Sequence, residues 1–81
     1  MRNPISAVSQ ETIDKPCIRA INHFIDLAQV SGKSFINYKE HCQSYGDFMF
    51  LFDEINKSRG GKFVRIDTRG GVEILYHPSA S

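Results

Sequence analysis

The strongest constraint on the fold is a β-hairpin pattern near the C-terminus. Two runs rich in β-branched and aromatic residues, 62–67 and 72–77, flank a glycine-bearing turn at 68–71. A glycine pair at 60–61 precedes the first run and Pro78 follows the second, as is typical of strand boundaries. Because an isolated hairpin is only marginally stable in water, this one must pack against the rest of the chain.

Helical spacing of apolar residues precedes the hairpin in three segments. The first helix is expected over about 15–30, and the second over about 35–44, with Ser34 as its N-cap. The third is expected over 48–58, with Asp47 as its N-cap. The chain is therefore predicted to be an α+β protein with three helices followed by a β-hairpin.

One segment leaves an alternative open. The apolar run 48–53 is also compatible with a buried strand, because periodicity alone cannot assign so short a run. The alternative fold has two helices packed on a three-stranded antiparallel meander. In either case the length of 81 residues allows one domain, expected over 15–77. We expect a flexible arm at 1–14 and a C-terminal tail at 78–81.

In order and size these elements resemble winged helix-turn-helix domains. The resemblance covers roughly residues 15–77, with Ser34–Tyr45 as second helix, Phe48–Ser58 as third helix and Lys62–His77 as the wing. It implies that the third helix approaches the major groove of DNA and that the wing contacts the backbone or the minor groove. A homodimer is compatible with this reading, because such domains commonly bind two half-sites.

The charge distribution supports a DNA-binding prediction. The whole chain has a formal net charge of +1, but five cations and one anion between Lys57 and Arg69 give that stretch +4. A local basic cluster can bind phosphate in a nearly neutral protein. The residues predicted to contact double-stranded DNA are Lys33, Ser34, Asn37, Lys39, Lys57, Arg59, Lys62, Arg65 and Arg69.

A second hypothesis is a small protein-binding adaptor or inhibitor. The apolar cluster Phe48–Phe52 has more large side chains than one helix face can bury in so small a core, and acidic Asp53 and Glu54 follow it. Met49 and Phe50 are therefore predicted to contact a protein partner.

The sequence supports no enzyme active site and no cofactor. Neither the cysteines nor the histidines have the spacing of a metal site, and nothing supplies an oxyanion hole for a Cys–His pair. We expect Cys17 and Cys42 to be buried free thiols, since no signal peptide is visible and disulfides are rare in the cytoplasm. No apolar run reaches the length of a membrane span. A cytoplasmic, non-enzymatic protein is the expectation.

Overall fold

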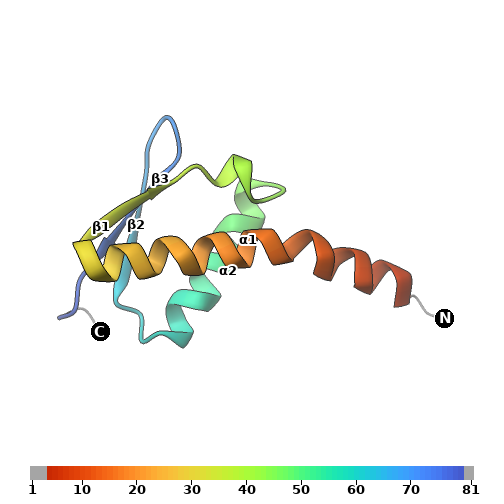
Figure 1. Ribbon diagram of the computed structural model, residues 1–81, viewed down its shortest axis with the longest axis horizontal. Helices are drawn as coiled ribbons and strands as arrows, with labels where there is room; N and C mark the ends of the chain where they lie inside the picture. Colours follow the sequence, from red (N-terminus) through yellow and green to blue (C-terminus); the bar gives the residue numbers. More distant parts are fainter. Residues whose placement is uncertain (1–3, 80–81) are drawn as a thin grey trace.

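The computed structural model describes the backbone of residues 4–79 and the side chains of residues 15–79. Over this part of the chain it has two α-helices, one short 3-10 helix (η1) and three strands (Figure 1). In chain order these are α1 Pro4–Ser31, β1 Lys33–Ile36, η1 Tyr38–Glu40, α2 Tyr45–Ser58, β2 Phe63–Asp67 and β3 Val72–Tyr76. The expected arm and tail include residues 1–3 and 80–81, which lie outside the described residues.

The three strands form one antiparallel sheet with β3 in the centre, in the order β1-β3-β2. In β3, Val72 and Ile74 are buried, whereas Glu73 between them is half-buried. Directly opposite Ile74 lie Ser34 of β1 and Arg65 of β2. Since neighbouring residues of a strand point to opposite faces, Ser34, Arg65 and Ile74 define the inner face of the sheet.

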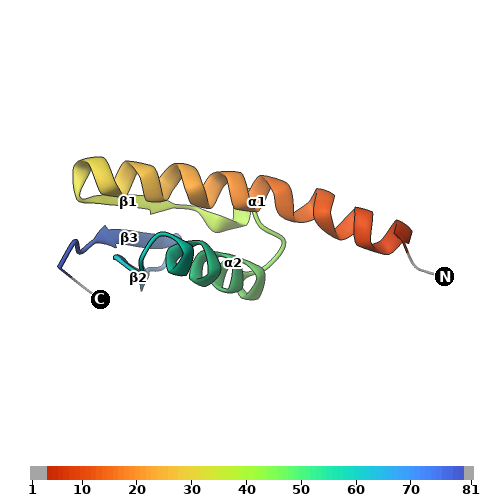
Figure 2. The same ribbon diagram turned by 90° about the horizontal axis from the view of Figure 1, so that it is seen from below.

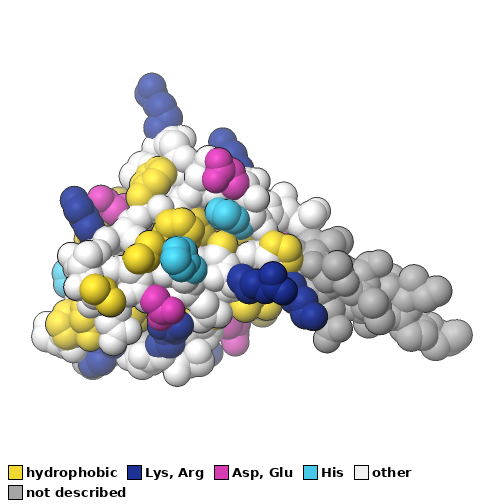
Figure 3. Space-filling view, in the orientation of Figure 1, with side chains coloured by type: hydrophobic (Ala, Val, Ile, Leu, Met, Phe, Trp, Pro, Cys, Tyr) yellow, Lys and Arg dark blue, Asp and Glu magenta, His cyan; other side chains and the backbone are white. Residues whose placement is uncertain are grey.

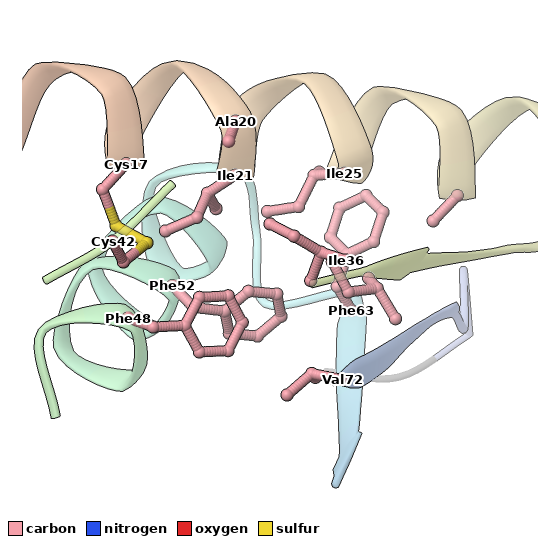
Figure 4. Packing of buried hydrophobic residues seen from close by; sticks show 12 residues of the cluster. Cys17, Ala20, Ile21, Ile25, Ile36, Cys42, Phe48, Phe52, Phe63 and Val72 are labelled. Atoms are coloured by element: carbon pink, nitrogen blue, oxygen red, sulfur yellow. A yellow bond between two sulfur atoms is a disulfide. The ribbon is translucent and has the colours of Figure 1, made fainter. Parts of the chain in front are cut away.

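The core lies between this inner face and the two helices. Figure 2 shows α1 running alongside β1, with α2 on the opposite side of the molecule. The close-up in Figure 4 shows Ile21 and Ile25 of α1 pointing toward Phe48 and Phe52 of α2. All four side chains are fully buried. Within α2 the rings of Phe48 and Phe52 pack against each other, with their centroids 5.9 Å apart.

The prediction of three helices followed by a hairpin is wrong. The segment expected as the second helix forms β1 and the single-turn η1 instead. Strand β1 gains its ladder from β3, with Ser34 opposite Ile74 and Ile36 opposite Val72, and this long-range pairing outweighs local helical spacing. The alternative, two helices packed on a three-stranded antiparallel meander, fits the structure in its helices and its antiparallel sheet. Its third strand is Lys33–Ile36 rather than 48–53, and the order β1-β3-β2 differs from that of a meander.

Two local predictions are confirmed. Residues 48–58 are helical, and the hairpin forms from β2 and β3. The cap of α2 differs from the expectation, because the Ser44 hydroxyl accepts a hydrogen bond from the Asp47 backbone N–H at 3.1 Å. Ser44 is therefore the N-cap, and Asp47 lies in the first turn, where its negative charge interacts favourably with the helix dipole.

Helix α1 begins at Pro4 rather than near Lys15. Proline is favourable as the first residue of a helix, because its missing N–H would have no partner there. Because the helix begins earlier, Pro16 lies inside α1 rather than in its first turn and removes one backbone hydrogen bond from it.

The expectation of free thiols is also wrong. Cys17 of α1 and Cys42, which follows η1, form a disulfide with their Cα atoms 4.7 Å apart (Figure 4). Both residues are buried at the same end of the core as Phe48. The bond ties α1 to the connection that leads into α2, a proximity that spacing in the sequence could not reveal.

Candidate functional site

Two arginines among the predicted DNA contacts, Arg59 and Arg65, make several contacts within the protein. Arg59, just after α2, donates from Nη1 to Asp26 Oδ1 at 2.7 Å and from Nη2 to Asn22 Oδ1 at 2.9 Å. Asp26 and Asn22 both lie on α1. The Arg59 guanidinium therefore joins the end of α2 to α1, and a phosphate would compete with these contacts.

Arg65 lies on the inner face of the sheet and contacts α2. Its Nη1 donates to Tyr45 Oη at 3.4 Å, and its Nη2 lies 3.5 Å from Asp53 Oδ1. The guanidinium carbon lies 5.8 Å from the centre of the Phe52 ring, within the range of a cation–π contact. These contacts hold the side chain between β2 and α2.

Tyr45 extends this network to the end of β2. Its hydroxyl donates to Asp67 Oδ2 at 2.6 Å. This hydrogen bond, reinforced by partial burial and by the negative charge of Asp67, raises the pKa of the Tyr45 phenol above its ordinary value. The arrangement is a structural link between α2 and β2, in which every charged group has an opposite or polar neighbour.

The other predicted DNA contacts lie on several different elements. Lys33 of β1 has its Nζ 3.8 Å from Glu73 Oε2, and the Ser34 hydroxyl donates to the Phe24 carbonyl at 2.6 Å. Among the side chains of residues 15–79, two polar atoms are buried without a hydrogen-bond partner, Asn37 Oδ1 and Arg65 Nε. Lys62 is half-buried, and the remaining predicted contacts, Lys39, Lys57 and Arg69, are exposed.

These cations do not form one continuous patch on the face shown in Figure 3. There the Lys and Arg side chains are separated from one another by uncharged and acidic ones. Lys57 belongs to the last turn of α2, Lys39 to η1 and Arg69 to the hairpin turn. The local charge of +4 in the sequence is therefore spread over more than one side of the folded chain.

The solvent face of α2 combines one aromatic ring with carboxylates. Phe48 and Phe52 are buried and Met49 is half-buried, but Phe50 is 64% exposed. Asp47, Asp53 and Glu54 are exposed at helical spacings of three and four from Phe50, and therefore lie on the same side of the helix. Of the two predicted protein contacts, Phe50 is fully available and Met49 partly.

A larger apolar surface, absent from the sequence predictions, lies on the outer face of the sheet. Phe35 of β1 and Ile66 of β2 both lie opposite Glu73 of β3. In the next row, Val64 of β2 lies opposite Leu75 of β3. Phe35, Val64 and Ile66 are 49%, 40% and 41% exposed, and Leu75 is half-buried. We call these four side chains the outer-face patch.

Neither helix covers the outer-face patch. The inner face takes both, because Ser34 bonds to α1 and Arg65 contacts α2. The ring of Phe35 also lies against the hairpin turn, since a Cβ built on Gly71 would be 2.8 Å from the Phe35 Cζ. This contact fixes one edge of the ring and leaves the rest in solvent.

Charged groups surround the outer-face patch. Lys33 lies opposite Leu75 and next to Glu73, and Lys62 continues the outer row of β2. Arg69 lies in the hairpin turn that joins β2 to β3. The surface is therefore an apolar centre with three cations and one carboxylate around or within it.

Two observations on the described side chains concern metal ligands and nucleophilic thiols. Within residues 15–79 no three His, Cys, Asp or Glu side chains are placed to hold a metal ion. Both sulfur atoms are consumed by the disulfide, so neither is a thiolate nucleophile. Among the helices of the described chain, none has the length and apolar character needed to cross a membrane.

Comparison of the chain with protein-family models, with curated proteins and with solved structures gave no match.

Proposed function

We propose that this protein is a non-enzymatic protein-binding module whose main contact surface is the outer-face patch. The observation that supports this most is an apolar group of side chains, Phe35, Val64, Ile66 and Leu75, on the side of the sheet that no described helix covers. Single exposed apolar residues are common, but four neighbours on one flat surface are typical of a binding site.

The chemistry of the surface defines the partner. An apolar side chain of the partner would contact Phe35 and Ile66, and carboxylates around it would meet Lys33 and Arg69. Such a patch covers on the order of 300 Å², worth roughly 7 kcal/mol of gross apolar burial at 25 cal/mol per Å². Loss of rotational and translational freedom offsets much of this, so we expect an affinity in the micromolar range.

DNA binding in the manner of a winged-helix domain is the second candidate. It is favoured by the exposed Arg69 in the hairpin turn, which is where a wing would reach a groove. Two features weigh against it. Arg59 and Arg65 are held by internal contacts, and the solvent face of α2 carries Asp47, Asp53 and Glu54, which phosphates repel.

The compartment follows from the disulfide in this proposal. The expectation of a cytoplasmic protein came from the lack of a visible signal peptide, and the Cys17–Cys42 bond contradicts the free thiols that were expected with it. Because reducing cytoplasm keeps most thiols reduced, we propose that the protein works where disulfides persist.

A peptide selection with the oxidised, full-length protein tests the main proposal. The protein is immobilised and a displayed library of random 12-residue peptides is selected against it. We expect enriched peptides to carry a large apolar residue flanked by Asp or Glu. The variant Ile66→Ser should weaken their binding at least tenfold, because it removes apolar surface from the centre of contact.

Val30→Ser is the matched control. Val30 is 88% exposed near the end of α1, outside the outer-face patch, so its replacement should leave peptide binding unchanged. If no enriched peptide distinguishes Ile66→Ser from Val30→Ser, the outer-face patch is not the binding surface. In parallel, anisotropy of a labelled random duplex between about 50 and 200 mM salt tests the second candidate, which requires binding that falls steeply with salt.

A further inference from the structure

The chemistry that fits the outer-face patch is present elsewhere on the same chain. On the solvent face of α2, Phe50 is 64% exposed and has Asp47, Asp53 and Glu54 around it at helical spacing. It is an aromatic side chain with carboxylates beside it, of which Asp47 and Glu54 are exposed and Asp53 also lies 3.5 Å from Arg65 Nη2. The outer-face patch is apolar with Lys33, Lys62 and Arg69 around it. The two surfaces are complementary in both hydrophobicity and charge.

We propose that a second copy of this chain is a partner, and that its α2 docks on the outer-face patch of the first copy. The inference rests on the proposed function, because it names an occupant for the same surface. Phe50 of one copy contacts Phe35 and Ile66 of the other. The carboxylates beside Phe50 then face Lys33 and Arg69.

The two surfaces cannot meet within one molecule. Helix α2 packs on the inner side of the sheet, through Phe48, Phe52 and the contacts of Arg65. Its solvent face therefore points away from the sheet, and the outer-face patch points the opposite way. Figures 1 and 2 show the backbone of these elements, with α2 lying beside the strands.

This geometry dictates the kind of assembly. A contact between two different surfaces is head-to-tail, so a docked pair still has one free α2 surface at one end and one free outer-face patch at the other. Association therefore continues beyond two copies rather than stopping at a symmetric dimer. One helix on three short strands is a contact at the small end of stable interfaces, so assembly should appear at about 10 μM to 1 mM.

Sedimentation velocity of the oxidised, full-length chain over that concentration range is the first measurement. We expect the weight-average mass of the wild-type protein to rise beyond that of a dimer with concentration. Phe50→Ser removes the aromatic side chain from α2, and Ile66→Ser removes apolar area from the sheet. Each variant alone should stay monomeric, whereas Val30→Ser should assemble like the wild type.

Mixing the two defective variants gives the sharper test. Phe50→Ser retains an intact sheet surface, and Ile66→Ser retains an intact α2 surface, so one contact between them remains possible. An equimolar mixture should form a heterodimer and stop there, because both free ends are defective. Circular dichroism before mixing checks that each variant is folded.

Three outcomes would overturn the inference: a wild-type protein that stays monomeric throughout, single variants that still assemble, or an equimolar mixture that stays monomeric. The proposed function fails separately, through the peptide selection. A monomeric wild type whose selected peptides lose affinity in Ile66→Ser would leave the binding module standing and remove the second copy as its partner. Peptides insensitive to Ile66→Ser would remove the surface itself.

Discussion

Gly71 lies where the hairpin turn comes close to β1. A Cβ on this residue would lie 2.5 Å from the Ile36 carbonyl oxygen and 2.8 Å from Phe35 Cζ. Because the nearer atom belongs to the backbone, β1 itself would have to shift. We expect Gly71→Ala to lower the free energy of unfolding by about 1–3 kcal/mol, as overpacking does in a core. Urea denaturation measures the loss.

Gly70→Ala is the matched control for that substitution. The nearest atom to a Cβ on Gly70 is Phe35 Cζ at 3.8 Å, which is an ordinary contact, and neither glycine has left-handed backbone geometry. Alanine there should leave stability unchanged or raise it by up to about 1 kcal/mol, through reduced freedom of the unfolded chain. Equal losses in the two variants would show that the close approach at Gly71 is not the cause.

The hydrogen bond between Tyr45 and Asp67 makes a prediction at alkaline pH. The pKa of Tyr45 is raised above 10.0 in the folded state, chiefly by this bond, so folding favours the protonated phenol. Its contribution to stability is complete below pH 10.0, the pKa of an unperturbed tyrosine, and is lost as pH rises through the folded pKa.

Asp67→Asn should therefore shift the titration of Tyr45 to lower pH, because it removes both the strongest acceptor and the negative charge. The ultraviolet absorbance of the phenolate measures this shift, and Tyr45→Phe identifies which transition belongs to Tyr45. Superimposable titration curves for the wild type and Asp67→Asn would contradict the assignment.

At the scale of the elements, α2 stabilises the start of β2 through the amide side chain of Asn56. Asn56 donates from Nδ2 to the Phe63 carbonyl at 2.9 Å, and its Oδ1 accepts from the Phe63 N–H at 3.1 Å. The side chain thus pairs with the start of β2 as a neighbouring strand would. We expect Asn56→Ala to lower the free energy of unfolding by about 1–3 kcal/mol, because it leaves two partly buried backbone groups unpaired.

Amide hydrogen exchange at Phe63 reports this contact directly and should be faster in Asn56→Ala. Ser58→Ala in the same turn of α2 is the control, since the Ser58 hydroxyl bonds only locally to the Ile55 carbonyl. Its effect on stability should stay within about 0.5 kcal/mol. Unchanged exchange at Phe63 would show that the Asn56 side chain does not protect the strand.

The elements that the sequence predicted correctly are those with local signals. Alternation and a glycine-bearing turn give the β2–β3 hairpin, and apolar spacing gives α2. Strand β1 was missed because its four residues acquire strand structure through pairing with β3, far along the chain. Apolar and aromatic residues at three- and four-residue spacing, Phe35, Tyr38 and Cys42 among them, have the pattern of a helix over the same segment.

The candidate site was harder to predict for a related reason. The sequence predicts that Phe50 is exposed, because the Phe48–Phe52 run has more large side chains than one helix face can bury. The outer-face patch includes Phe35, which lies beside Glu73 only because β1 pairs with β3. The alternation of Val64 and Ile66 with Phe63 and Arg65 in β2 was the available signal. It indicates two different faces but not which one the helices cover.

The whole molecule has a small core, and the disulfide compensates for it. A chain of 81 residues buries a limited share of its surface on folding, and most of the core consists of medium-sized side chains around Phe48 and Phe52. The Cys17–Cys42 bond spans 25 residues and encloses β1 and η1. In the proposed function the outer face of the sheet stays uncovered for a partner, so only the inner face packs against the core. Stability must therefore come from one face of the sheet and from the covalent link.

Breaking this bond should cost the molecule a large part of its stability. Closing a loop of this size lowers the entropy of the unfolded chain, which raises its free energy by about 3.5 kcal/mol at 25 °C. We expect the reduced wild-type protein to unfold at a Tm about 15–25 °C below the oxidised protein, given about 4–8 °C for each kcal/mol in a domain of this length. Thermal unfolding by circular dichroism, with and without reductant, measures the difference.

The Tm of the variant Cys17→Ala/Cys42→Ala should match that of the reduced protein or lie slightly below it, because the variant also loses two buried sulfur atoms. It should not respond to reductant. A wild-type Tm that reductant leaves unchanged, while mass spectrometry shows both thiols free, would mean that the noncovalent contacts of the core hold the fold together without the disulfide.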